Sequence, residues 1–243
     1  MVTHGIDVSK HQGMIDWSKV KTDFAILRAG FGCYSEQEDL MFQRNYEGAK
    51  AAGIPVGAYW YSYATTVEEA RQEAKACLQV LSGKQFEYPI YVDIEDALQC
   101  YIEKDVLTAI AEAFCDTLEK AGYFAGVYAS TYWFINKLDH ARLAERYTIW
   151  LADYRAVYNK TLMCNMHQYT SGGILAGISG RVDMNICTLD FPSIIKKAGL
   201  NGYSETAAPN RPGLKTFSAQ ASPGDLEKLE QLAKSLKLSY KIE

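Results

Sequence analysis

Short apolar runs alternate with stretches of helical periodicity along the first half of the chain, and this alternation constrains the fold more than any other feature. A short, continuous apolar run fits a strand that is buried on both faces, and repeated strand–helix units are typical of a parallel sheet. Strands are predicted over residues 4–9, 24–30, 56–63, 89–95, 124–129, 147–152, 164–169 and 181–187. Long helices are predicted over residues 42–52, 67–81 and 106–121.

The number of strands and the uneven spread of helices predict the fold class. After residue 129 the connections are too short or irregular for long helices, so we expect an α/β fold: an irregular, TIM-like β/α barrel of eight strands with fewer helices in its second half. An open, doubly wound sheet is the alternative.

The chain is long enough for one large domain with a small appendage. We expect the barrel to cover residues 1–198. Residues 199–213 are rich in Gly, Ser, Pro and Asn and read as a linker, and residues 214–243 form a small βαβ-like C-terminal segment. A unit this short cannot bury an adequate core alone, so we expect it to be a targeting module, to form a homodimer, or to pack on the barrel.

Composition excludes several classes of protein. The net charge is −4 with no basic stripe, which argues against nucleic acid as a partner. No apolar run approaches the roughly 18 residues of a membrane-spanning helix, and the first residues do not resemble a signal peptide. We therefore expect synthesis in the cytoplasm and no membrane insertion. The six cysteines and four histidines show no metal-ligand spacing, so we expect no metal and no cofactor.

Asp93 and Glu95 end one of the apolar runs and are the strongest candidates for chemistry. Side chains alternate along a strand, so this pair faces one way and Ile94 faces the other, with Cα atoms about 6.5–7 Å apart within the pair. Two carboxyl groups at such a separation suit acid-assisted attack on a glycosidic bond, and their repulsion raises one pKa so that a proton is retained. The alternative is a helix cap or loop salt bridge that also involves Asp96.

Asp7 and Asp183 strengthen the catalytic interpretation. Each places an ionisable group in an otherwise apolar strand, the first and the eighth respectively. In a closed barrel these two strands are neighbours, so the two aspartates are predicted to lie side by side. Several acidic residues at one rim are costly unless function requires them.

The motifs resemble those of family 25 glycoside hydrolases, the Chalaropsis-type lysozymes. The resemblance begins with Gly-Ile-Asp-Val-Ser-Lys-His-Gln-Gly at residues 5–13 and Ile-Asp-Trp at 15–17. It continues through Leu-Arg-Ala-Gly at 27–30, Gly-Ile-Pro-Val-Gly-Ala-Tyr-Trp at 53–60, Tyr-Val-Asp-Ile-Glu at 91–95, Trp-Leu-Ala-Asp-Tyr at 150–154, Gln-Tyr at 168–169 and Val-Asp-Met-Asn at 182–185. It covers residues 4–192, in the order of the family, and leaves the end of the chain unmatched, so the resemblance implies that a targeting role of residues 214–243 would be wall targeting.

The resemblance implies a peptidoglycan hydrolase, a 1,4-β-N-acetylmuramidase that cuts between N-acetylmuramic acid and N-acetylglucosamine. Glu95 would be the general acid/base, and Asp93 would assist the acetamido group of the substrate as the nucleophile. Asp7 and Asp183 would line the subsite and orient those groups. The sequence leaves open whether Asp93 is instead a direct nucleophile.

Further side chains are candidates for substrate binding. The aromatic candidates for stacking on sugar rings, with core packing as the alternative for each, are Tyr59, Tyr61, Tyr128, Trp150 and Tyr169. Gln168 is a candidate for a hydrogen bond to a sugar or a carboxylate. Arg28 is expected to pair with the acidic cluster or to form an ion pair behind it.

Two sources and two competing functions remain open for the chain. The expected partner is the glycan strand of bacterial peptidoglycan, and the protein is either a phage endolysin, released through a holin or by lysis of the host, or a bacterial autolysin. A carbohydrate-binding barrel that has lost catalysis is the competing function, which the presence of all four acidic residues disfavours. A chitinase-like barrel is disfavoured because the strand that ends at Glu95 lacks additional upstream aspartates.

Overall fold

The computed structural model describes residues 2–155 and 161–204, and these form a barrel of eight strands. The strands are β1 (Thr3–Val8), β2 (Phe24–Phe31), β3 (Val56–Tyr61), β4 (Ile90–Asp93), β5 (Ala125–Ser130), β6 (Thr148–Ala152), β7 (Met166–Gly173) and β8 (Val182–Cys187). Every strand predicted from the sequence is present, with shifts of a few residues at the ends. The predicted C-terminal segment, 214–243, lies outside the described residues.

The barrel is closed in the order β1 to β8, which confirms the predicted barrel and not the open sheet. Neighbours from β1 to β7 pair in parallel, but β8 is antiparallel to both β7 and β1. The parallel pairing expected from the strand–helix units therefore holds for β1 to β7 and does not extend to the last strand. Only residues 174–181 separate β7 from β8, whereas a parallel crossover needs about a dozen residues or more, so the chain turns back as a hairpin.

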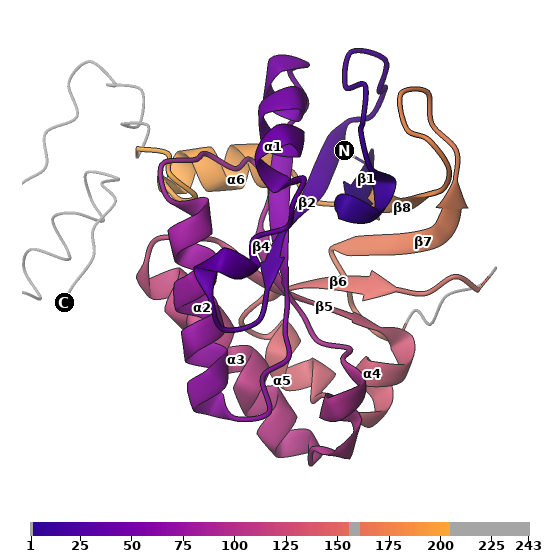
Figure 1. Cartoon of the computed structure of the whole chain (residues 1–243). Helices are drawn as coiled ribbons and strands as arrows, with labels where there is room; N and C mark the ends of the chain where they lie inside the picture. Colours follow the sequence, from indigo (N-terminus) through magenta and orange to yellow (C-terminus); the bar gives the residue numbers. More distant parts are fainter. Residues whose placement is uncertain (1, 156–160, 205–243) are drawn as a thin grey trace, which may run out of the picture. The chain divides into compact units, whose positions relative to one another are not determined.

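The long helices follow the early strands, as predicted. The helices are α1 (Phe42–Ala51), α2 (Val67–Leu81), α3 (Lys104–Lys120), α4 (Thr131–Asn136), α5 (His140–Ala144) and α6 (Phe191–Ala198). The Thr66 side chain caps α2 by accepting from the backbone N–H of Glu69. In turn, the Glu69 carboxylate accepts from the backbone N–H of Thr66, which completes a capping box. Figure 1 shows α2 and α3 side by side against the strands and the β7–β8 hairpin away from them. Within the described residues, no helix combines the length and the apolar character needed to cross a membrane.

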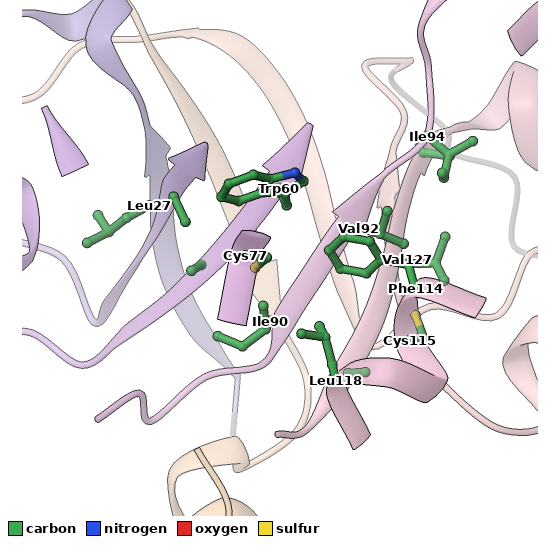
Figure 2. Close-up of a cluster of buried hydrophobic side chains, with 14 of the residues drawn as sticks. Leu27, Trp60, Cys77, Ile90, Val92, Ile94, Phe114, Cys115, Leu118 and Val127 are labelled. Atoms are coloured by element: carbon green, nitrogen blue, oxygen red, sulfur yellow. The ribbon is translucent and has the colours of Figure 1, made fainter. Parts of the chain in front are cut away.

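The main hydrophobic core lies between the strands and the helices. Alternate residues of β4 point outwards into it: Ile90 and Val92 are fully buried, and so is Ile94 just beyond the strand. Figure 2 shows these three side chains in one buried cluster with Phe114 and Leu118, which belong to α3. Burying such side chains stabilises the fold by about 1.5–3 kcal/mol each, which fixes the face that β4 presents to the helices.

A second cluster of apolar and aromatic side chains fills the inside of the barrel. Phe24 stacks on Tyr88 with ring centroids 4.3 Å apart, and Phe191 of α6 packs edge-on against Tyr88 at 5.8 Å. Large interior rings require small residues opposite them. A Cβ atom on Gly126 would lie 2.5 Å from the ring of Tyr91, so this position of β5 admits only glycine without a shift of the ring.

Residues 199–204 pack on the same end of the barrel, although the sequence placed them at the start of a linker. Asn201 is fully buried, and its amide donates to the backbone O of Tyr88 at 2.9 Å and accepts from the backbone N of Phe124 at 2.7 Å. Tyr203 donates its hydroxyl to Glu87. These contacts satisfy backbone groups at the starts of β4 and β5, so the described barrel extends beyond α6.

Glu73 of α2 is a buried carboxyl group outside the barrel interior. Its side chain is 0% exposed, and Oε1 accepts from the backbone N of Tyr63 at 2.8 Å, while Oε2 has no hydrogen-bond partner among the described residues. Burial raises the pKa of Glu73 to about 7 in spite of the hydrogen bonds it receives from Ser62 and Tyr63. The Glu73 carboxyl group therefore keeps its proton to a higher pH than an ordinary glutamate does. Its hydrogen bond with Tyr63 connects the loop after β3 to α2.

We expect Glu73→Gln to stabilise the protein at neutral and alkaline pH. The folded pKa lies above the ordinary value of 4.5, so the folded state binds more protons, and stability falls as pH rises from about 4.5 to about 7. The neutral amide removes this loss of stability, which is on the order of 3 kcal/mol once the pH is well above 7. Urea denaturation at pH 5 and pH 8 should show a gain for the variant at pH 8 that shrinks at pH 5.

The exposed Glu68, on the same helix, provides the matched control. Glu68→Gln should leave the pH dependence of stability unchanged. An equal effect of Glu73→Gln at both pH values would contradict the prediction.

Candidate active site

A cavity of about 190 Å³ opens at the end of the barrel where β1 to β6 terminate. Its lining consists of Asp7, Tyr59, Asp93, Glu95, Tyr128, Trp150, Tyr154, Gln168 and Asp183. A wider hollow of about 650 Å³ lies beside α1, but its charged side chains are exposed and of mixed sign. The candidate site is therefore the smaller cavity, where four carboxyl groups share one enclosure.

Strand geometry brings the four predicted acidic residues together. Asp93 and Glu95 both line the cavity, while Ile94 between them is buried in the core outside the barrel, which is the alternation expected of β4. Asp7 and Asp183 lie directly opposite each other in the antiparallel register of β1 and β8. The predicted adjacency of these two aspartates is present in the structure.

Burial raises the pKa of every acid in the cluster, and the charges of neighbouring acids add to the rise at Asp7, Asp93 and Glu95. Burial, and after it the charge of Asp183, raise the pKa of Asp7 to about 7, although hydrogen bonds from Asn185 and Gln168 lower it. Burial and then Glu95 raise the pKa of Asp93 well above its ordinary value. The pKa values of Glu95 and Asp183 are also raised, chiefly by burial. Such a cluster holds protons at neutral pH, as a general acid must.

Two amide side chains donate to Asp7. Gln168 Nε2 and Asn185 Nδ2 both lie within hydrogen-bond distance of Asp7 Oδ2, at 2.8 and 2.7 Å. By contrast, Asp93 Oδ1 is buried with no hydrogen-bond partner among the described residues. A buried acceptor without a partner is uncommon in native proteins, which makes Asp93 a candidate for a role in the site.

Arg28 does not line the cavity but pairs behind it with Asp39. Arg28 Nε and Nη2 both lie 2.6 Å from Asp39 Oδ2, and Asp39 also accepts from the backbone N–H groups of Lys10 and Met41. The ion pair behind the cluster, which the sequence left as an alternative, is therefore the arrangement present. The charge of Arg28 still lowers the pKa of Asp93, against burial and Glu95.

The predicted sugar-binding side chains divide into two groups. Tyr59, Tyr128, Trp150 and Gln168 line the cavity. Tyr61 lies beyond Tyr59 on β3 and donates its hydroxyl to Asp96 at 3.3 Å, outside the cavity. Tyr169 also lies outside the cavity lining: it follows Gln168, which points into the barrel, and neighbours on a strand point to opposite faces.

Three residues of the site were not singled out from the sequence. Tyr154 lines the cavity and donates to Gln168 Oε1 at 2.7 Å, Asn185 contacts Asp7, and Asp39 holds Arg28. The first two lie inside motifs that carry the family resemblance, which was the available signal. Asp39 lies in a loop outside these motifs, and no sequence signal pointed to it. In the described ranges, no group of three or more His, Cys, Asp or Glu side chains is arranged to hold a metal ion.

A closed β/α barrel with several carboxyl groups in one cavity suits a glycosidase. Residues 6–178 match the sequence profile of glycosyl hydrolases family 25, so the chain belongs to that family.

Relatives of known name agree with this assignment. The chain is 27% identical over 186 residues to an autolytic lysozyme of Clostridium acetobutylicum, covering 74% of this chain and 54% of the relative. It resembles the modular autolysin LytC of Streptococcus pneumoniae, solved with a synthetic peptidoglycan ligand, with a TM-score of 0.68 and 28% identity over 77% of this chain and 47% of that one. The chain thus spans about half the length of both proteins.

A bacterial lysozyme from Streptomyces coelicolor shares the fold over nearly its whole length. The TM-score is 0.69 at 23% identity, with 83% of this chain and 98% of that chain covered.

We expect Asp183→Asn to lower the pKa of Asp7 from about 7, because the variant removes the neighbouring negative charge. The pKa should remain above 3.8, since burial is the larger cause and is unchanged. A titration of the Asp7 carboxyl carbon by NMR, assigned with Asp7→Asn, measures the shift. Asp16→Asn, which removes an exposed charge outside the cavity, is the control, and an Asp7 titration unaffected by Asp183→Asn would contradict the expected coupling.

Proposed function

We propose that the protein hydrolyses bacterial peptidoglycan at the β-1,4 bond between N-acetylmuramic acid and N-acetylglucosamine. The observation that carries the proposal is the cavity in which Asp93 and Glu95 face the same space, in a chain of glycosyl hydrolases family 25. The peptidoglycan ligand of LytC and the autolytic activity named for the clostridial relative support this choice of substrate.

Glu95 is proposed as the general acid and base. It is only half-buried, whereas Asp93 is 4% exposed, so Glu95 is the member of the pair that a leaving group can reach. Its raised pKa, caused by burial and by Asp183, keeps a proton available for the glycosidic oxygen. After the bond breaks, the same carboxylate takes a proton from the water that attacks the sugar C1 atom.

Asp93 is proposed to orient the acetamido group of the muramic acid residue. The Asp93 carboxylate, which lines the cavity, accepts the acetamido N–H in this proposal, and that bond turns the carbonyl oxygen towards C1 as an internal nucleophile. The resulting ring is cationic. Burial makes an anionic Asp93 costly in the empty cavity, but it also strengthens the attraction between that anion and a cationic intermediate.

Product analysis tests the proposed bond. Purified protein is incubated with peptidoglycan, and new reducing ends are reduced with borohydride and identified. Muramitol is the expected product. Glucosaminitol, or no release of reducing ends, would contradict the proposed cleavage.

We expect Glu95→Gln to lower activity at least about a hundredfold while the protein remains folded, the lower range for loss of a general acid. Activity is measured as reducing ends released per enzyme, and folding by circular dichroism. Glu103→Gln, an exposed glutamate outside the cavity, is the matched control and should retain full activity. An unchanged rate for Glu95→Gln would remove Glu95 from this role.

A further inference from the structure

The hydrogen bonds around Asp7 form a chain that begins at the indole of Trp150. Trp150 Nε1 donates to Asn185 Oδ1 at 2.8 Å, and Asn185 Nδ2 donates to Asp7 Oδ2 at 2.7 Å. Trp150 and Asn185 are 1% and 0% exposed, so water does not compete for these bonds. The chain crosses the barrel from β6 through β8 to β1.

The indole group permits a single orientation of the Asn185 amide. An indole N–H can only donate, whereas a side-chain amide has one accepting and one donating end. If the amide were reversed, its NH2 group would face the indole N–H and its oxygen would face Asp7 Oδ2. The contact between the NH2 group and the indole N–H would be repulsive whether or not Asp7 is protonated, so Asn185 donates to Asp7.

Gln168 does not impose the same constraint. Its Oε1 atom accepts from the hydroxyls of Tyr128 at 3.0 Å and Tyr154 at 2.7 Å, and a hydroxyl can either donate or accept. A reversed Gln168 amide could therefore keep both tyrosines as partners. The contact between Trp150 and Asn185 is the part of the network that sets its direction.

Packing holds the indole ring in place. The ring centroid of Trp150 lies 4.5 Å from that of Tyr128, 5.1 Å from Tyr91 and 6.0 Å from Tyr59. With aromatic neighbours on several sides and 1% exposure, the ring has no free face for a sugar, although it borders the cavity. Its polar edge is its remaining functional feature.

We propose that Trp150 is a positioning residue: its indole N–H orients Asn185, and Asn185 in turn fixes Asp7 Oδ2 as a hydrogen-bond acceptor. The inference rests on the proposed function for its effect on catalysis. Because Oδ2 receives two N–H donors, a proton bound by Asp7 resides on Oδ1. An ionised Asp7 then stabilises the positive charge that develops at the sugar C1 atom.

Other groups around the cavity also influence the protonation of Asp7. The acidic groups are Asp183 from β8 and Asp93 and Glu95 at the end of β4. The hydroxyl groups are those of Tyr59, Tyr128 and Tyr154. Arg28 of β2 is paired with Asp39. The experiment must therefore change the indole N–H without changing any of these charges.

Trp150→Phe is the required change, with Trp60→Phe as the matched control. Trp60 is also fully buried and donates its indole N–H at 2.9 Å, but to the backbone O of Gly32, with no link to Asp7. In Trp150→Phe the NMR titration of the Asp7 carboxyl carbon should move up by about one pH unit, the size expected when one of two hydrogen bonds to a carboxylate is weakened. The acidic limb of kcat/KM should move in the same direction, and Trp60→Phe should shift neither.

A double variant separates orientation of Asn185 from ring packing. In Asn185→Leu the Asp7 titration should also move up, and adding Trp150→Phe to that background should produce no further shift, because the intermediary is absent. An additional shift, or equal titrations of Asp7 in Trp150→Phe and Trp60→Phe, would overturn the proposal. The comparison of the two tryptophan variants stands even if Asn185→Leu does not fold.

The two proposals fail in different ways. If the wild-type protein releases no reducing ends from peptidoglycan, the proposed function fails, and the Asp7 titration still decides the role of Trp150. If the wild type is active but Asp7 titrates alike in the two tryptophan variants, only the positioning role fails.

Discussion

The antiparallel pairing of β8 with β1 closes the barrel, and the acidic site depends on it. Because β8 runs opposite to the other strands, its beginning lies at the rim where β1 to β6 end. Asp183, the second residue of β8, is thereby placed opposite Asp7 near the end of β1. A parallel eighth strand would carry its first residues to the other end of the barrel, and the cavity would lose one of its four carboxyl groups.

Concentrating acids in one cavity opposes stability, and the surrounding structure offsets part of that cost. Away from the cavity, the inside of the barrel is filled by apolar and aromatic side chains, such as Phe24, Tyr91 and Phe191, which pack against the strands. At the cavity, the side-chain amides of Asn185 and Gln168 supply neutral hydrogen-bond donors to Asp7. Neutral donors favour the carboxylate without neutralising it, so the cluster retains its repulsion and its raised proton affinity.

Strand alternation made much of the fold and the acid cluster predictable, because it depends only on counting along the chain. The shared facing of Asp93 and Glu95 follows directly from the period of two in β4. What counting does not reveal is which side chains meet across the closed barrel. The contact of Asn185 with Trp150 and the pairing of Arg28 with Asp39 depend on register and on a loop residue, so the sequence led us to treat Trp150 as a stacking surface.

The pairing of Arg28 with Asp39 explains why a cation beside the cluster does not suppress its proton affinity. A free guanidinium near Asp93 would form a direct ion pair, which would lower the pKa of that carboxyl and occupy its oxygen atoms. Asp39 instead binds both Nε and Nη2 of Arg28, so the arginine acts on Asp93 only at longer range. Among the described residues, Asp93 Oδ1 is therefore left without a hydrogen-bond partner.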